Sequence, residues 1–413
     1  MKLKSTSPAL AAGILSLSFA TGAAALETPQ STTVLEFADS KTLFVADSDG
    51  GRVFAYTLPE AAPAAESRSY NLISLGARLA ASTGADPYSI SYHDIAVHPV
   101  SKETYISMSL SSGDSKSPMI VRVDQDGTIT PLDLTTLEGT SVELNGTPDD
   151  SVTFWHDIPA AAFTVTDLDF VDGTLFAAGL STGEFASTLR QIPYPFTESA
   201  STSSIEIYHT VHNQTETRAP IRAMSVVDLD GVKTVVAAYT CTPLVTIPSG
   251  DLADGAHVSG KTVAELGYGN TPLEVLHFTA PNEEFQPEEY VLVINKERDA
   301  DLIRVSDLAE ASKGEGLSSP ELWGDAGVKT AARPLGAVLQ ADDQDEQFLV
   351  TLKRNLDTGD VDLVSFRKGA YFRLSDFVSE YNFPDYQYVE EQEFFRNFQN
   401  MLKADAGYAD LAR

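Results

Sequence analysis

A unit of short strands and tight turns recurs along most of the chain, and this repeat restricts the possible folds more than any other feature. Strand-forming runs bounded by Asp, Asn and Gly follow one another from Val34 to Arg367, with almost no helical periodicity between them. In residues 34–58 three such runs are separated by turns at Asp39 and at Gly50-Gly51. Six copies of the unit are visible, at 34–58, 94–132, 166–193, 221–248, 271–308 and 333–367.

An antiparallel unit of three or four strands has two faces and cannot bury both of them by itself. Radial stacking of the copies buries both faces, and this is the arrangement of a β-propeller. At about 50 residues per blade the chain has room for seven blades, so we predict an all-β fold, a seven-bladed β-propeller with a short C-terminal helix. The seventh blade is expected to be split, and closed by an N-terminal segment paired with a C-terminal strand. Two β-sandwiches are the alternative, but the constant order of strands and turns favours the propeller.

The first 25 residues have the layout of a secretory signal peptide. Lys2 and Lys4 precede an apolar run from about Ala9 to Ala20, and small residues end at Ala25, where we expect cleavage. The sequence therefore predicts a signal peptide at 1–25, a propeller at 26–370 and a C-terminal extension at 371–413. We expect a periplasmic or secreted protein, and no later apolar run is long enough to predict a membrane span.

The charge of the chain excludes one class of partner. Lys and Arg number 28 against 59 Asp and Glu, which gives a formal net charge of −31. Removal of residues 1–25 would take away two lysines and no acid, so the charge would become −33. A chain this acidic lacks the basic stripe that nucleic acid or anionic lipid requires, and neither is expected as a partner.

The C-terminal extension contains one helical pattern. Phe395, Phe398 and Leu402 share one face of a helix predicted from Val389 to Lys403. Two roles are open for this amphipathic helix. It could dock against the side of the propeller, or it could bind a protein partner.

The repeat also predicts where functional residues would gather. In a propeller, the starts of the inner strands and the loops between second and third strands meet around a central funnel. Arginines are scarce in this chain, yet several fall at these positions, and arginine binds carboxylate, phosphate or sulfate through two parallel hydrogen bonds. The predicted site for a small anionic ligand consists of Arg222, Arg298, Arg333, Asp167 and Asn270. Alternatively, the arginines neutralise nearby aspartates and hold the blades together.

A metal site at the same funnel is a further hypothesis. His209 and His212 lie just before an inner strand, Glu216 follows in the same loop, and Cys241 is the only cysteine of the chain. A mixed set of nitrogen, sulfur and oxygen ligands suits copper or zinc. The predicted metal ligands are His93, Asp94, His212 and Cys241. The alternative for Cys241 is a small, inert packing residue.

Several segments carry a resemblance to known proteins. HDIAVHP, LSTGEFASTLRQIPYPF, YTCTPLV and GNTPLEVL together resemble a family of uncharacterised exported bacterial β-propellers of the seven-bladed type. That resemblance implies the fold and supplies no activity. Asp94, Asp167 and Asn270 are also similar to the oxygen ligands that hold calcium in lactonase-like propellers, where the ion polarises an ester carbonyl. Those propellers also use a Glu near the start of the first blade, and Glu36 lies in that region without matching the pattern clearly.

Three functions remain compatible with the sequence. The first is a binding or accessory propeller whose funnel takes a metal ion or a small anionic ligand. The second is a metal-dependent enzyme, either a copper-type oxidoreductase or a calcium-dependent, lactonase-like hydrolase. The third is a scaffold that presents one face or the C-terminal helix to a partner protein. The chain has no Gly-rich phosphate loop, no GxSxG elbow and no haem-attachment CxxCH motif.

Overall fold

The computed structural model describes residues 26–376, apart from positions 67, 114, 150, 155, 156, 184, 198, 242, 268 and 323, and residues 392–405. The predicted signal peptide and the first residues of the predicted C-terminal helix lie outside the described residues. Within the described ranges, no helix is both long enough and apolar enough to cross a membrane.

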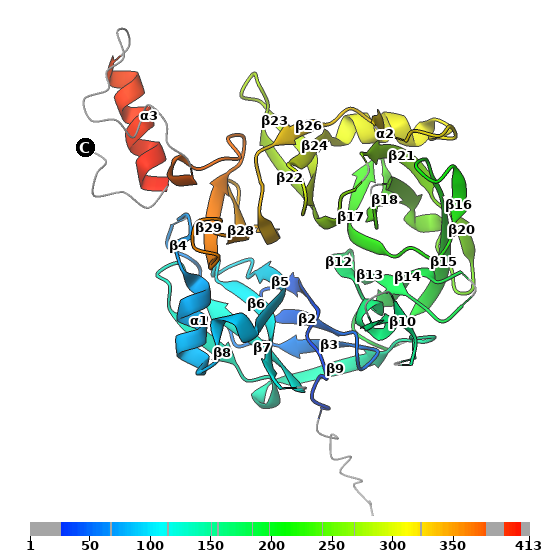
Figure 1. Ribbon diagram of the computed structural model, residues 1–413, viewed down its shortest axis with the longest axis horizontal. Helices are drawn as coiled ribbons and strands as arrows, with labels where there is room; N and C mark the ends of the chain where they lie inside the picture. The colour runs from blue at the N-terminus through cyan, green and yellow to red at the C-terminus, as the bar shows by residue number, and fades with distance from the viewer. Residues whose placement is uncertain are drawn as a thin grey trace, which may run out of the picture.

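Six sheets surround a central axis, and each forms one blade of a propeller (Figure 1). We name each blade by its innermost strand and give the strands from the axis outward. The β1 blade contains β1 (Val34–Asp39), β2 (Thr42–Asp47), β3 (Arg52–Thr57) and β9 (Glu138–Glu143). The β5 blade contains β5 (Ile90–Val97), β6 (Thr104–Ser112), β7 (Ser115–Val123) and β8 (Ile129–Leu132). The β12 blade contains β12 (Asp167–Val171), β13 (Thr174–Leu180), β14 (Ser187–Pro193) and β15 (Ser201–His209), and β15 also pairs with β16 (Gln214–Glu216) and β20 (His257–Ser259).

The other three blades follow in the second half of the chain. The β17 blade contains β17 (Ile221–Leu229), β18 (Val232–Tyr239), β19 (Pro243–Pro248), β21 (Lys261–Leu266) and β25 (Asp325–Gly327). The β22 blade contains β22 (Pro272–Pro281), β23 (Pro287–Asn295), β24 (Ala300–Arg304) and β26 (Ala331–Arg333). The β27 blade contains β27 (Val338–Asp343), β28 (Phe348–Arg354), β29 (Val361–Arg367) and β4 (Asn71–Leu72).

Helices and one small hairpin complete the described structure. The α-helices are α1 (Leu75–Thr83), α2 (Val305–Lys313) and α3 (Gln392–Asp405). The hairpin pairs β10 (Thr153–Phe154) with β11 (Ile158–Pro159). The short 3₁₀ helices are η1 (Pro87–Ser89), η2 (Leu134–Thr136), η4 (Ala160–Phe163), η5 (Ser249–Asp251) and η6 (Leu374–Asp376).

The inner strands form a closed ring, which confirms the predicted propeller. Going round the axis, β5 contacts β1, β1 contacts β12, and β17, β22 and β27 follow before β27 contacts β5 again. The described residues therefore form six blades and not the seven that we predicted. The six repeats seen in the sequence are the six blades. The prediction of a seventh came from dividing the length by about 50 residues per blade, whereas the segments between repeats add outer strands such as β15, β21 and β25.

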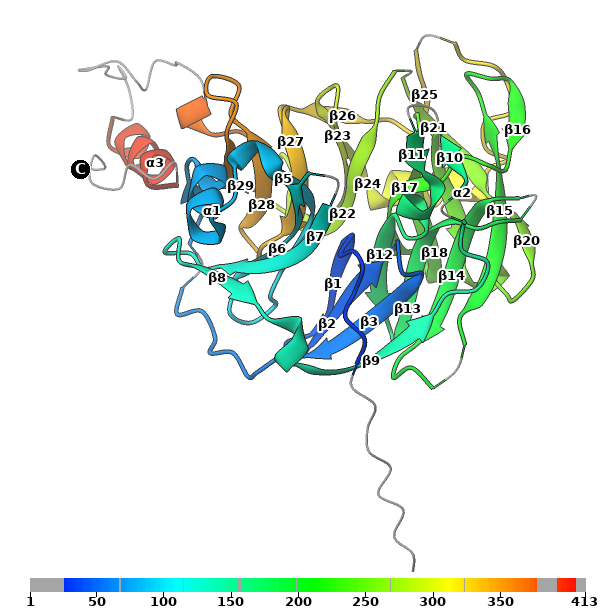
Figure 2. The ribbon, with the colours of Figure 1, turned by 60° about the horizontal axis from the view of Figure 1, so that its bottom comes forward.

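The order of blades around the ring differs from their order along the chain. The β1 blade comes first in sequence, yet it lies between the β5 and β12 blades (Figures 1 and 2). After β3, the chain crosses to the far side of the β5 blade, where β4 pairs with β29. It then forms the β5 blade and returns as β9, which pairs with β3 along six residues. The pairing of β4 with β29 completes the β27 blade, whereas the sequence predicted such a pairing for a seventh blade that the described residues do not form.

The hydrophobic core lies between neighbouring blades, so middle strands are buried on both faces. All six residues of β2 are buried, and so are the last six residues of β18. Successive side chains of a strand point to opposite faces. Accordingly, Ala237 of β18 packs in one apolar cluster with Ile205 of the β12 blade, while Ala238 packs in another with Val291 of the β22 blade. This explains why the middle strands read as apolar runs instead of alternating patterns.

The C-terminal helix lies outside the ring, beside β29 and β4 (Figure 1). Helix α3 was predicted from Val389 to Lys403, and the structure places it at Gln392–Asp405. Asp405 forms an ion pair with Arg367 of β29 at 2.6 Å, and Leu402 is 8% exposed. Phe398 and Met401 are 38% and 37% exposed. The helix therefore contacts the propeller through its last turn, and a protein partner for it stays a prediction.

The return of β9 to the first blade generates a stability prediction. Gly139 of β9 lies opposite Tyr56 of β3, and a Cβ atom at Gly139 would lie 2.5 Å from the carbonyl oxygen of Ala55. Because that oxygen belongs to the backbone, Gly139→Ala must displace one strand. We expect a loss of about 1–3 kcal/mol in the free energy of unfolding and a lower Tm, measured by thermal and urea unfolding. Gly250→Ala is the matched control, since no atom lies within 4 Å of the position that a Cβ atom would take there. Equal Tm values for the two variants would contradict the prediction.

Candidate functional site

The innermost strand of every blade is an edge of its sheet, so its axial N–H groups have no strand partner. Aspartates from neighbouring blades provide the acceptors. Asp94 on β5 accepts a hydrogen bond from the N–H of Leu35 on β1, with a donor–acceptor distance of 2.7 Å. Asp167 on β12 accepts one from the N–H of Met224 on β17 at 2.6 Å. Each of these hydrogen bonds joins a side chain of one inner strand to the backbone of the next, so these aspartates hold adjacent blades together.

Two further aspartates repeat this arrangement. Asp342 on β27 accepts from the N–H of Val97 on β5 at 2.6 Å. Asp169 on β12 accepts from the N–H of Val226 on β17 at 2.5 Å. Each contact joins a carboxylate of one inner strand to the backbone of the next one around the ring. These aspartates therefore join neighbouring inner strands, and they also place acidic groups close to the axis.

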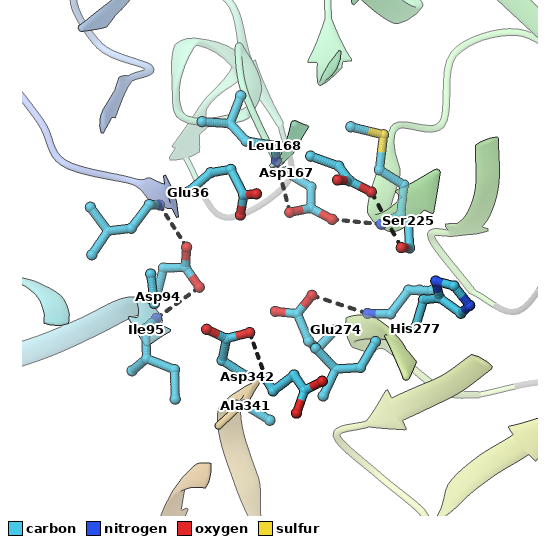
Figure 3. Close-up of a pocket in the computed structure, with 17 residues that line it drawn as sticks. Glu36, Asp94, Ile95, Asp167, Leu168, Ser225, Glu274, His277, Ala341 and Asp342 are labelled. Atoms are coloured by element: carbon cyan, nitrogen blue, oxygen red, sulfur yellow. Dashed lines mark hydrogen bonds between the residues drawn. The ribbon is translucent and has the colours of Figure 1, made fainter. Parts of the chain in front are cut away.

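The carboxylates of the inner strands surround a cavity of about 220 Å³ on the propeller axis (Figure 3). Seven acidic residues line it: Glu36, Asp94, Asp167, Asp169, Glu274, Asp342 and Asp343. The described lining includes no lysine or arginine. Lys368 forms an ion pair with Asp343 at 2.7 Å. Figure 3 shows Glu36, Asp94 and Glu274 directed toward the same central space. We call this group of seven the channel carboxylates.

Burial and mutual repulsion make these acids weak. Burial raises the pKa of Asp167 to about 8, even though two backbone hydrogen bonds oppose the shift. Burial likewise raises the pKa of Asp342 to about 7 and that of Asp169 to about 6. The pKa values of Glu36 and Glu274 are raised well above their usual range, first by burial and then by the charges of neighbouring aspartates. The channel therefore favours either protons or a bound cation near neutral pH.

The four predicted metal ligands lie in different places. Asp94 lines the channel, and His93 sits at a β-bulge in β5, where its Nε2 lies 2.9 Å from Ser109 Oγ. A bulge re-aims the side chain at that position, which alternation along the strand does not predict. Cys241 is a half-buried free thiol in the turn between β18 and β19. Among the described residues, one group of His, Cys, Asp or Glu ligand atoms lies within 4.8 Å of one another, and it joins His212 to His209 and Glu216.

Of the residues predicted to bind an anion, Asp167 and Arg222 lie near the axis. Arg222 is close enough for its charge to oppose the rise in the pKa of Asp167, and its guanidinium lies 5.3 Å from the centre of the Phe163 ring. Asn270 is buried and donates a hydrogen bond to Asn295 Oδ1 at 2.6 Å. Neither Arg222 nor Asn270 is part of the cavity lining.

The other two arginines lie away from the channel. Arg298 donates to the carbonyl oxygen of Leu266 and lies 3.9 Å from Asp325. Arg333 was expected at the start of an inner strand, but it ends β26, the outermost strand of the β22 blade. The inner strand β27 begins only at Val338, because the segment from Pro334 to Gly336 forms no strand after β26 ends. The guanidinium of Arg333 instead lies 5.3 Å from the centre of the Tyr371 ring.

Four channel carboxylates were not predicted from the sequence: Asp169, Glu274, Asp342 and Asp343. The signal that could have found them is an acid inside an otherwise apolar inner strand, as in VLEF and PLEVL. Glu36, which lay near the position of a lactonase-like calcium ligand, does line the channel with Asp94 and Asp167. Asn270, the third residue of that resemblance, does not.

Comparisons with known proteins add no family. No family model and no curated protein matches the chain. Among solved structures, it is similar to extracellular domains 1–2 of Drosophila Semaphorin 1b, with 9% identity, a TM-score of 0.36, and coverage of 83% of this chain and 85% of that one. Drosophila Plexin A in complex with Semaphorin 1b gives 9% identity, a TM-score of 0.33 and coverage of 83% and 86%. The extracellular domain of a one-component system from B. thetaiotaomicron gives 9% identity, a TM-score of 0.31, and coverage of 82% of this chain and 44% of that one. The assignment of the fold therefore rests on the strand topology of the chain itself.

The raised pKa values predict how stability changes with pH. Unfolded Asp has a pKa of about 3.9, whereas the folded values are about 8 for Asp167 and about 7 for Asp342. Between about pH 4 and pH 8 the folded state therefore binds more protons than the unfolded state, so stability falls as pH rises. In chelator at constant ionic strength, we expect a lower free energy of unfolding at pH 8 than at pH 5, measured by urea unfolding.

A pair of variants separates the channel from the rest of the acidic chain. Glu36→Gln with Glu274→Gln removes two charges from the channel and should flatten the decrease between pH 5 and pH 8. Glu283→Gln with Glu284→Gln removes two charges from an exposed loop and should leave the decrease unchanged. Stability that increases from pH 5 to pH 8 in the unmodified protein would show that the channel carboxylates are not protonated as we infer.

Proposed function

We propose that this chain is an exported β-propeller that binds a divalent cation, with Ca²⁺ as the preferred ion, in its central channel and serves a binding or accessory role. One observation carries the proposal: the seven channel carboxylates surround a cavity of about 220 Å³ whose described lining has no lysine or arginine. Five of the six blades contribute at least one of these acids.

The charge of the lining favours a cation over the anionic ligand considered from the sequence. Buried charges interact more strongly than exposed ones because little water screens them. Each ionised channel carboxylate therefore repels the others, as the raised pKa values indicate. A divalent cation relieves this repulsion, whereas a carboxylate or phosphate ligand would add to it.

The chemistry of the donors favours calcium among divalent cations. The acidic lining offers oxygen ligands, and Ca²⁺ accepts six to eight oxygens at about 2.3–2.6 Å in flexible geometry that includes waters. Apart from the group at His209, no three His, Cys, Asp or Glu ligand atoms among the described residues lie within 4.8 Å of one another. The ion would therefore reach some of the channel carboxylates through water, or after rotation of the flexible side chains of Glu36 and Glu274.

Calcium binding is testable on the purified protein. At pH 8, isothermal titration calorimetry should show one Ca²⁺ per chain, and saturating Ca²⁺ should raise the Tm, because an ion bound only by the folded state stabilises it. Glu36→Gln with Glu274→Gln should weaken binding by about tenfold or more, equivalent to about 1.4 kcal/mol.

The exposed pair Glu283→Gln with Glu284→Gln is the charge-matched control and should bind Ca²⁺ like the unmodified protein. Protons compete for the same carboxylates, so the rise in Tm should be smaller at pH 5 than at pH 8. The proposal is wrong if Ca²⁺ leaves the Tm unchanged at pH 8, or if both double variants bind it equally well.

A further inference from the structure

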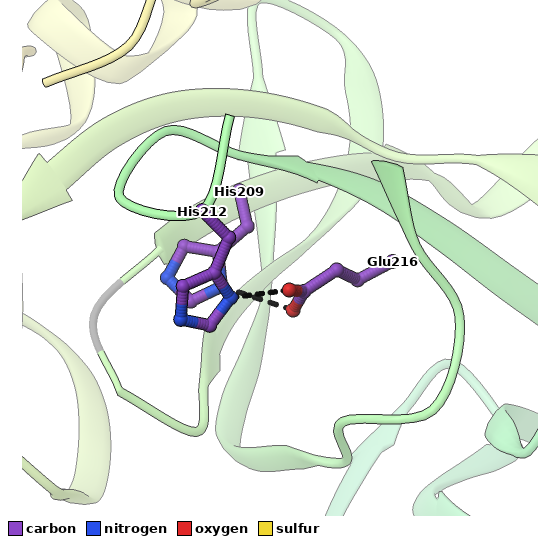
Figure 4. Close-up of side chains that lie close together, drawn as sticks. All are labelled: His209, His212 and Glu216. Carbon is purple, nitrogen blue, oxygen red and sulfur yellow. Dashed lines mark hydrogen bonds and ion pairs between the residues drawn. The ribbon is translucent and has the colours of Figure 1, made fainter. Parts of the chain in front are cut away.

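A second set of ligand-type side chains lies at the outer edge of the β12 blade, away from the channel. Strands β15 and β16 form a hairpin in which His209 pairs with Gln214 and Ile207 pairs with Glu216. Side chains at alternate positions share a face, so His209 and Glu216 lie on the same side of the hairpin. His212 belongs to the connecting turn and folds over that side (Figure 4). The turn thus brings together two histidines that would face opposite sides of a continuous strand.

Both imidazole rings approach one carboxylate. The Nδ1 atom of His209 lies 3.0 Å from Glu216 Oε2, and the Nδ1 atom of His212 bonds to Glu216 Oε1. The two ring centres are 4.0 Å apart. Ligand atoms of the three residues all lie within 4.8 Å of one another. We call these residues the hairpin triad.

The hairpin triad lies at the boundary with the next blade, where two buried polar atoms have no hydrogen-bond partner. His209 is 1% exposed, and its Nε2 atom has no partner among the described residues. Glu265, on β21 of the β17 blade, is 0% exposed and accepts from Thr210 Oγ1 at 2.5 Å through Oε2, while its Oε1 atom has no partner in the described part of the chain. Buried polar atoms left without a hydrogen-bond partner destabilise the folded state. The boundary between the two blades at the hairpin triad therefore contains polar atoms whose hydrogen-bonding capacity the described protein groups do not satisfy.

We propose that His209, His212 and Glu216 bind a Zn²⁺ ion between the outer edges of the β12 and β17 blades. Zinc bonds to nitrogen and oxygen are about 2.0–2.2 Å long, which places neighbouring tetrahedral ligands about 3.4 Å apart. The distance of 3.0 Å between His209 Nδ1 and Glu216 Oε2 is close to that value. Two imidazoles and one carboxylate form a recognised three-ligand zinc set, with the fourth position open to water.

The surroundings of the hairpin triad also suit an ion that enters from solvent. The side chain of His212 is 47% exposed, whereas those of His209 and Glu216 are 2% and 14% exposed. An ion can therefore arrive beside His212 and be held by the two buried ligands. Nitrogen donors select zinc over calcium, so this site differs in chemistry from the channel. Bound zinc would fix the β15–β16 hairpin beside β21 of the next blade.

The experiment uses the purified protein after chelator treatment and removal of the chelator. Zn²⁺ is titrated by calorimetry, and Co²⁺ is added separately because tetrahedral Co²⁺ has strong visible absorption. We expect one Zn²⁺ per chain and a tetrahedral Co²⁺ spectrum. His212→Ala and Glu216→Gln should each weaken Zn²⁺ binding by about tenfold or more. His212 is half exposed, so its replacement is compatible with folding, which circular dichroism would verify.

His257→Ala is the matched control. His257 lies on β20, which pairs with the same strand β15, and its Nε2 is 3.2 Å from Glu206 Oε2. Among the described residues, however, His257 and Glu206 belong to no group of three ligand residues. Zinc affinity should survive His257→Ala, and also Glu36→Gln with Glu274→Gln, which tests independence from the channel. Zinc binding that is unchanged by His212→Ala and Glu216→Gln, or that is lost equally in His257→Ala, would overturn the proposal.

Discussion

The unpaired N–H groups on the inner edge of each blade are the constraint on which the rest of this structure depends. A strand at the edge of a sheet must satisfy these donors without a further strand, and six such edges face one another around the axis. Here Asp94, Asp167 and Asp342 reach across to the backbone of the adjacent inner strand. The contacts between neighbouring blades thus depend on carboxylates as well as on apolar packing.

The same solution concentrates negative charge where water is scarce. Each aspartate that caps a neighbouring strand also brings its charge toward the axis, and Glu36 and Glu274 add their own charges to the same cavity. Removing these groups from water disfavours their charged form. Adhesion between blades and affinity for cations are therefore two results of one arrangement, and the protein cannot strengthen the first with further aspartates without also increasing the second.

The sequence predicted the fold well because the repeat is local: each copy contains its own strands, turns and apolar runs. The number of blades was overestimated because the length was divided by about 50 residues per blade, whereas outer strands such as β9 and β4 come from segments that lie between the repeats. Asp94 and Asp167 were found since each lies near the start of an inner strand of the aligned repeat. Glu274 was missed because its strand begins as the apolar run PLEVL, and Asp342 because it lies near the end of its strand and not at the start. Only the closed ring shows that one side of those strands meets the axis. The sequence prediction included His212 among the metal ligands but left out His209 and Glu216, for a similar reason. Spacing alone does not show that the chain turns at 210–213 and that His209 and His212 consequently share a face.

The placement of the first blade has a consequence for how the molecule responds to force and to fraying. In a ring whose blades follow the chain in order, the first and last blades adjoin at one junction, and an end can open there. In this ring the first three strands lie between two later blades, and β9 covers their outer edge. A force applied on the N-terminal side must therefore separate β1 from both β5 and β12, so the first blade cannot detach while the ring stays closed. The contacts that close the first blade join residues about 80–90 positions apart, as with Phe54 and Ser141, so no continuous stretch of chain can complete this blade by itself.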